Sequence, residues 1–201
     1  MARTPLTARR LLGLDRSGPP PPATRRGQPL RPWTIPNAIG YARLALLPLF
    51  LVLALGSGDG RSVSAALVYA VIGGLDYLDG ILARLTGQYS RLGTLLDPLI
   101  DRLLVVSGVV VAWRFELLPR WALAVLVVRE LLMIVLSRIA LSRGLDIAIT
   151  MVGRWAVWPT MFSIFLAMLS DTWLAAALLY LGVALSLWAT AISIREARRL
   201  S

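Results

Sequence analysis

The chain of 201 residues contains no cysteine, no histidine and no lysine. Without cysteine and histidine, it cannot form disulfides, zinc sites of the Cys/His type, a thiolate nucleophile or an imidazole base. Carboxylates are therefore the obvious candidates for acid–base chemistry. All 21 basic residues are arginine. A genome rich in G and C is enough to explain that bias, so we attach no function to it.

Polar sequence is also scarce, because 57% of the residues are hydrophobic and the mean hydropathy is +0.71. This composition indicates an integral membrane protein. Six apolar segments each approach the ~20 residues that a bilayer crossing needs. They cover residues 35–55, 62–85, 94–115, 119–141, 151–170 and 173–194. In lipid only helices and closed barrels satisfy their backbone groups, so the sequence predicts an all-α bundle of six transmembrane helices.

The first 32 residues differ from the rest of the chain. They carry seven arginines and a run of four prolines at 19–22, but no apolar stretch long enough for a span or a secretory signal. Such a segment is predicted to be a cytosolic tail, either disordered or attracted to anionic lipid headgroups. We favour disorder with weak membrane attraction, and expect the membrane domain to cover residues 33–201.

Arginines are distributed unevenly between the apolar segments. With the N-terminus in the cytosol, only Arg61, Arg114 and Arg120 fall in the external connections. The positive-inside rule then predicts that both termini are cytosolic. The connection between the second and third segments also lies on the cytosolic side, where water-soluble ligands reach it. We expect the protein in the plasma membrane.

Four aspartates interrupt the apolar sequence around this connection: Asp76, Asp79, Asp97 and Asp101. In helices, the first two share one face and the last two share another. Each Asp at the centre of a transmembrane helix costs about 2.5–3.5 kcal/mol on insertion scales, so a purely structural role is disfavoured. Carboxylate-rich, all-oxygen sites suit hard cations such as Mg²⁺ or Mn²⁺. The pattern predicts a metal site, with two ions expected.

The spacing of these residues is more specific than their composition. It reads Asp76-x2-Asp79-Gly80-x2-Ala83-Arg84-x8-Gly93-x3-Asp97-x3-Asp101. This pattern resembles the signature of the CDP-alcohol phosphotransferase family, and the six-segment layout also looks like that family. The resemblance implies attack by an alcohol on the β-phosphorus of a CDP-linked lipid, with release of CMP.

The resemblance also implies residue roles. Asp76 and Asp97 are expected to bridge two metal ions and Asp79 to complete the first. Asp101 is expected to bind the second ion and to act as the general base. Contacts with the CDP-lipid are implied for Asn37, Gly80, Ala83, Arg84, Ser90 and Gly93. Gly80 and Ala83 alone are equally consistent with tight helix packing. Gly40 departs from the family, which often has a hydroxyl residue there.

The acceptor alcohol is less well specified. The pair Arg129–Glu130 resembles the bacterial phosphatidylglycerolphosphate synthase branch of the family, and Arg154 resembles a basic residue that helps bind the acceptor phosphate there. Ala156 is more like the CMP-forming cardiolipin synthases. Positive-inside topology alone is an alternative explanation for Arg154. We favour glycerol 3-phosphate as the acceptor, with phosphatidylglycerol as the alternative.

Two other classes of protein remain open. Paired aspartates could line the conduit of a cation or proton transporter, but such a protein predicts carboxylates spread along the membrane normal. A noncatalytic scaffold is the third possibility, and Asp101 argues against it. We therefore expect a homodimeric enzyme that transfers a phosphatidyl group from CDP-diacylglycerol.

Overall fold

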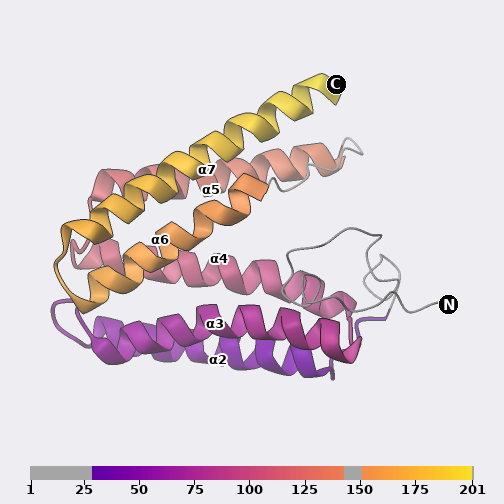
Figure 1. The fold of residues 1–201 in the computed structure, drawn as a ribbon, viewed down its shortest axis with the longest axis horizontal. Helices are drawn as coiled ribbons and strands as arrows, with labels where there is room; N and C mark the ends of the chain where they lie inside the picture. Colours follow the sequence, from indigo (N-terminus) through magenta and orange to yellow (C-terminus); the bar gives the residue numbers. More distant parts are fainter. Residues whose placement is uncertain (1–28, 143–150, 201) are drawn as a thin grey trace. The chain divides into compact units, whose positions relative to one another are not determined.

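The computed structural model describes residues 29–142 and 151–200, with side chains over 29–135, 156–192 and 194–195. Within these residues it contains helices and no strand (Figure 1). The helices are α2 (Ile35–Leu55), α3 (Val63–Thr86), α4 (Arg91–Arg114), α5 (Arg120–Ser142), α6 (Met151–Leu169) and α7 (Trp173–Leu200). The predicted all-helical architecture is confirmed. Almost all of the predicted tail lies outside the described residues.

Local capping explains several helix boundaries. The hydroxyls of Thr34, Ser62 and Ser90 each accept a hydrogen bond from the backbone N–H three residues later, at 3.3, 3.2 and 2.9 Å. These bonds satisfy donors at the starts of α2, α3 and α4. Because Ser90 caps α4, that helix begins at Arg91, before the predicted start at residue 94. At the end of α3, Gly87 adopts a left-handed φ of 65°, which glycine tolerates without strain.

Three described helices are long and apolar enough to cross a membrane. They are Ile35–Leu55, Val63–Thr86 and the stretch Trp173–Ile192 of α7. Trp33 and Trp173, at the starts of α2 and α7, are 90% and 82% exposed. Exposed tryptophans at helix ends are typical of the membrane–water interface. These features indicate a membrane protein, while six crossings and cytosolic termini stay predictions.

The chain divides into two compact units. The first comprises Met1–Phe50 and Leu67–Leu104, and the second comprises Leu51–Ala66 and Val105–Ser201. Helices α2, α3 and α4 therefore each contribute residues to both units. The four predicted metal-binding aspartates all belong to the first unit.

Apolar side chains from three helices form the core of the first unit. Phe50 of α2 packs against Tyr69 of α3, with ring centroids 5.1 Å apart. Ile72 of α3 and Ile100 and Leu104 of α4 are fully buried. Burial of these side chains fixes which faces of the three helices meet.

In the second unit, α7 packs against α6 and α5 (Figure 1). The hydroxyl of Ser163 in α6 donates a 2.6 Å hydrogen bond to the carbonyl of Ala175 in α7. Further along, a Cβ added to Gly182 would lie 2.3 Å from Oγ1 and 3.1 Å from the backbone nitrogen of Thr160. The two helices thus approach closely because one of them carries glycine.

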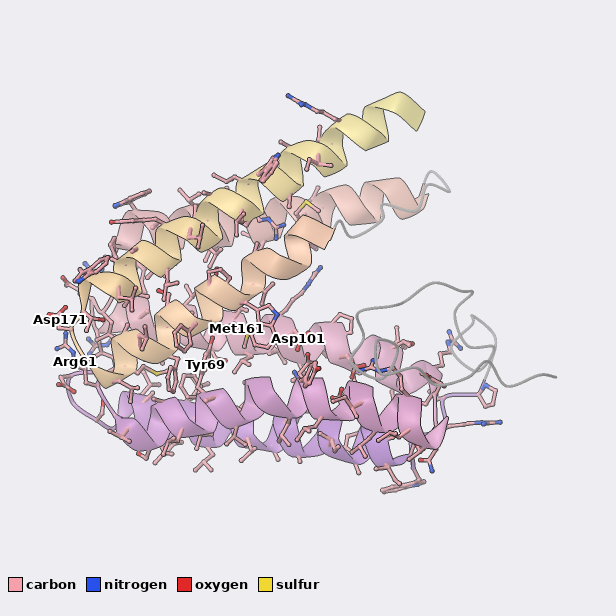
Figure 2. All side chains as sticks on the ribbon, in the orientation of Figure 1. Arg61, Tyr69, Asp101, Met161 and Asp171 are labelled. Atoms are coloured by element: carbon pink, nitrogen blue, oxygen red, sulfur yellow. The ribbon has the colours of Figure 1, made fainter. Side chains whose placement is uncertain are left out.

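Two turns also meet within the second unit. The backbone N–H of Ser62 donates to the carbonyl of Met168 at 3.0 Å. Arg61 forms an ion pair with Asp171 at 3.2 Å, and Figure 2 shows the two side chains beside each other. These contacts bind the α2–α3 turn to the α6–α7 turn.

The close approach at Gly182 leads to a stability prediction. We expect Gly182→Ala to lower the stability of the protein by about 1–3 kcal/mol, because the new methyl group forces the helices apart. Thermal unfolding in detergent measures the change. Gly74→Ala in α3 is the matched control, since nothing lies within 4 Å of its added Cβ. Equal melting temperatures for the two variants would contradict the packing argument.

Candidate active site

Side chains of α2, α3 and α4 meet around one buried arginine in the first unit. Arg43, from α2, is completely buried. Its Nη1 donates to Asp76 at 2.8 Å and to Asp79 at 3.3 Å, both on α3. Its Nη2 donates at 2.6 Å to Asp101 on α4, which is labelled in Figure 2. Three of the four predicted aspartates therefore converge on one cation.

The fourth aspartate lies in the same neighbourhood. Asp97 precedes Asp101 by one turn of α4, so both occupy one face of that helix. It interacts electrostatically with Asp76, Asp79 and Arg43. The structure thus brings together the four carboxylates that the sequence singles out, and their individual roles stay predictions.

The carboxylate cluster has a buried side and an open side. The side chain of Asp79 is 8% exposed, whereas those of Asp76 and Asp101 are 43% and 48% exposed. Arg43 supplies its charge from the buried side. Of the three carboxylates bonded to Arg43, Asp76 and Asp101 are therefore more accessible to a ligand than Asp79.

The chemistry of the cluster fits a divalent cation. The cluster offers carboxylate oxygens, which suit Mg²⁺ and Mn²⁺. Three of the carboxylates already point toward a positive group, the guanidinium of Arg43. Among the described residues, no group of three acidic side chains forms a ready-made metal site. The donor set thus matches the expected ions, while the arrangement seen is built around Arg43.

Three residues predicted to contact the CDP-lipid contact one another. The buried Asn37 donates through Nδ2 to the carbonyls of Arg31 and Pro32, at 3.0 and 3.1 Å. Its Oδ1 accepts a 2.8 Å hydrogen bond from the hydroxyl of Ser90. A Cβ on Gly93 would lie 2.9 Å from that same Oδ1. These residues join the start of α2 to the start of α4, and their contact with a CDP-lipid stays a prediction.

The connection between α3 and α4 is held at two further points. The backbone N–H of Ile35 donates to Oε1 of Gln88 at 3.0 Å. The backbone N–H of Leu92 donates to the carbonyl of Leu30 at 3.3 Å. The segment before α2 therefore lies along the turn that separates the two aspartate pairs.

A second arginine lies over the small residues that follow Asp79. A Cβ added to Gly80 would lie 3.3 Å from Nη1 of Arg84, so the guanidinium extends back along α3 over Gly80. Ala83 is half-buried beside it in the chain. Glycine thus leaves the guanidinium room on the helix surface directly after the carboxylate pair.

The predicted acceptor residues belong to the second unit. Nε of Arg129 on α5 donates to Oγ1 of Thr190 on α7 at 3.0 Å, and Nη1 pairs with the adjacent Glu130. The charge of Arg129 is therefore balanced within the protein. Arg154 lies in α6, but its side chain is outside the described residues.

The sequence pattern does not single out Arg43, although this residue forms hydrogen bonds with three of the four carboxylates. The available signal was its position inside an apolar segment, because an ionisable residue within a membrane span is a functional candidate. Its partners are 33, 36 and 58 residues away in the chain, so no local spacing connects it to them.

The chain is similar in sequence to a known protein family and to individual members of it. The model of the CDP-alcohol phosphatidyltransferase family matches residues 33–188. A CMP-forming cardiolipin synthase of Streptomyces coelicolor is 41% identical over 174 residues, which cover 83% of this chain and 80% of the relative. A CDP-diacylglycerol–glycerol-3-phosphate 3-phosphatidyltransferase of Bacillus subtilis is 28% identical over 144 residues, covering 66% and 75%.

The family match covers most of the chain and includes every aspartate of the cluster. It confirms the resemblance that the aspartate signature predicts. The protein belongs to the CDP-alcohol phosphatidyltransferase family and is therefore a membrane transferase of phospholipid biosynthesis.

Proposed function

We propose that the protein transfers the phosphatidyl group of CDP-diacylglycerol to phosphatidylglycerol and releases CMP. The observation that carries the reaction type is the convergence of Asp76, Asp79 and Asp101 beside Asp97. In this reaction the acceptor hydroxyl oxygen attacks the β-phosphorus. The bond from that phosphorus to the bridging oxygen breaks, and CMP leaves with the bridging oxygen.

The carboxylates divide the work of this reaction. Asp101 on α4, whose side chain is half exposed, accepts the proton of the attacking hydroxyl. Asp76 and Asp97 would help to hold both ions, Asp79 would complete the ligands of the first, and Asp101 would contribute to the second. When bound, Mg²⁺ or Mn²⁺ polarises the hydroxyl and neutralises charge on the diphosphate.

The residues around the cluster are assigned to the donor substrate. Arg84 binds a phosphate of the CDP group, because a guanidinium forms paired hydrogen bonds with phosphate oxygens. Gly80 and Ala83 allow the cytidine to approach α3. Asn37, Ser90 and Gly93, which join the start of α2 to the start of α4, also contact the CDP group.

The acceptor assignment rests on charge and on similarity. Glycerol 3-phosphate is a small dianion that requires free positive charge beside a carboxylate-rich site. Arg129 is engaged by Glu130 and Thr190, so its charge is already balanced. Phosphatidylglycerol has one phosphodiester charge and is held by its acyl chains. The 41% identity to a cardiolipin synthase supports the same acceptor.

Glycerol 3-phosphate is the second candidate. The similarity to the Bacillus subtilis enzyme favours it, since that relative is named for this acceptor. Under this alternative Arg154 holds the acceptor phosphate, and Arg154→Ala raises the KM for glycerol 3-phosphate far more than that for CDP-diacylglycerol.

An assay with separate acceptors tests the proposal. Purified protein in liposomes receives CDP-diacylglycerol, Mg²⁺ or Mn²⁺, and one of phosphatidylglycerol, glycerol 3-phosphate, inositol phosphate or serine. We expect CMP release and cardiolipin formation with phosphatidylglycerol. Incorporation of labelled glycerol 3-phosphate without cardiolipin would transfer the assignment to the second candidate. No CMP release with any acceptor would contradict both.

We also propose a setting for the enzyme: a plasma-membrane homodimer with its carboxylates facing the cytosol. Arginine-rich connections on that side support this orientation. The nucleotide of the donor is water-soluble and must reach the cluster from an aqueous side. Labelling of single cysteines, introduced into this cysteine-free chain, tests the orientation in intact cells.

A further inference from the structure

Arg43 makes an unusual set of contacts for a residue within an apolar helix. Its guanidinium forms four hydrogen bonds, and its side chain is fully buried. Besides the three aspartates, it donates through Nε to the backbone carbonyl of Ile72 at 3.1 Å. One side chain of α2 therefore holds both α3 and α4.

The shape of the guanidinium matters for this arrangement. Its donors are fixed in one plane, with Nε directed at the backbone of α3 and the two Nη atoms directed at separate helices. A lysine has the same charge but only one nitrogen, which cannot occupy the three donor positions. Arg43 thus combines a charge with a geometry that lysine lacks.

Each bonded carboxylate uses one oxygen for Arg43. These are Oδ1 of Asp76, Oδ2 of Asp79 and Oδ1 of Asp101. The second oxygen of each carboxylate is not among these contacts. The side chains of Asp76 and Asp101 are almost half exposed, so a ligand on the open side can reach both carboxylates. Arg43 thereby determines how the two carboxylates are turned.

The charge of Arg43 also changes the net charge of the carboxylate cluster. It offsets one of the four carboxylate charges, which reduces their mutual repulsion. With two divalent cations added, the set has a net positive charge that favours an anionic diphosphate. Without the guanidinium, the same set is neutral.

We propose that Arg43 is a positioning residue that orients Asp76, Asp79 and Asp101 for binding divalent cations. The proposal rests on the metal-dependent function proposed above, but it concerns the arrangement of the ligands rather than the substrate. A residue that merely stabilises the fold would affect melting temperature without changing the affinity for the metal.

Cation binding by the full-length protein tests this role directly. Wild type, Arg43→Lys and Arg43→Gln are titrated with Mn²⁺, and free Mn²⁺ is followed by electron paramagnetic resonance. Melting temperature and CMP release are measured on the same samples. Arg102→Gln is the control, because Arg102 is an exposed arginine next to Asp101.

We expect Arg43→Lys to fold and to bind Mn²⁺ at least about tenfold more weakly, because lysine keeps the charge but lacks the separate planar donors of the guanidinium. CMP release should fall about 10²-fold, as misplacement of reacting groups by 1 Å does elsewhere. Arg43→Gln should lose more of both, and Arg102→Gln should behave as wild type. If Arg43→Gln fails to fold, Arg43→Lys decides.

Wild-type Mn²⁺ affinity in Arg43→Lys would overturn the proposal, even if its melting temperature is lower. In a third outcome, Arg43→Lys binds Mn²⁺ more weakly but the wild type itself releases no CMP. That result would support the role of Arg43 and contradict the proposed reaction. Absence of Mn²⁺ binding by the wild type would overturn both.

Discussion

Replacement of Asp101 by asparagine is expected to reduce CMP release by about 10²–10⁴-fold while CDP-diacylglycerol binding is largely retained. The amide cannot accept the proton of the attacking hydroxyl. Its oxygen can still accept the hydrogen bond from Nη2 of Arg43, so the contact between α2 and α4 persists. The loss should therefore appear in kcat.

Two variants calibrate this result. Asp76→Asn should lose both donor binding and transfer, because Asp76 is proposed to hold both ions. Asp171→Asn should leave activity unchanged, since Asp171 is 89% exposed and its ion-pair partner among the described residues is Arg61, at the surface. Donor binding is measured with radiolabelled CDP-diacylglycerol and turnover by CMP release. Wild-type turnover in Asp101→Asn would exclude Asp101 as the base.

Removal of divalent cations is expected to lower the rate of transfer by a factor of about 10³ or more. Lewis-acid stabilisation contributes several kcal/mol, and each 1.36 kcal/mol is tenfold in rate. The cluster offers only carboxylate oxygens, and this chain has no cysteine or histidine to hold a softer metal. Activity should vanish in EDTA and return when Mg²⁺ or Mn²⁺ is added in excess.

A stability measurement separates metal loss from damage by the chelator. Binding of an ion to the folded state alone raises stability by about 2.7 kcal/mol at a concentration one hundred times its Kd. The melting temperature should therefore rise with Mg²⁺ in the wild type and much less in Asp76→Asn. CMP release that continues unchanged in EDTA would contradict the two-ion mechanism.

Helix positions followed closely from the sequence, because the length of an apolar segment and the turn-forming residues at its ends are local properties. The predicted segments 35–55 and 151–170 correspond to α2 and α6 to within one residue. The last predicted apolar segment ends at residue 194, close to the end of the apolar stretch at Ile192, whereas helix α7 continues through charged residues to Leu200. Hydropathy places the end of a span where charged residues begin, but the helix itself can continue beyond the membrane into water.

The polar joint between α2 and α4 was only partly predictable. The resemblance to the family assigned Asn37, Ser90 and Gly93 to contacts with the CDP-lipid. The structure shows that they bond to each other across 53 residues of chain and that Gly93 leaves room for the amide of Asn37. A side chain that a motif marks can therefore position the site as well as contact the ligand.

Sequence alone determined that this chain is a helical transferase with two aspartate pairs, each on one helix face, because helical periodicity and the spacing of a signature are properties of a short segment. Only the tertiary structure decided that members of both pairs bond to Arg43 and that Arg129 is already engaged by Glu130 and Thr190. Periodicity specifies which residues share a face. Packing of apolar side chains from distant segments decides which face of another helix they meet.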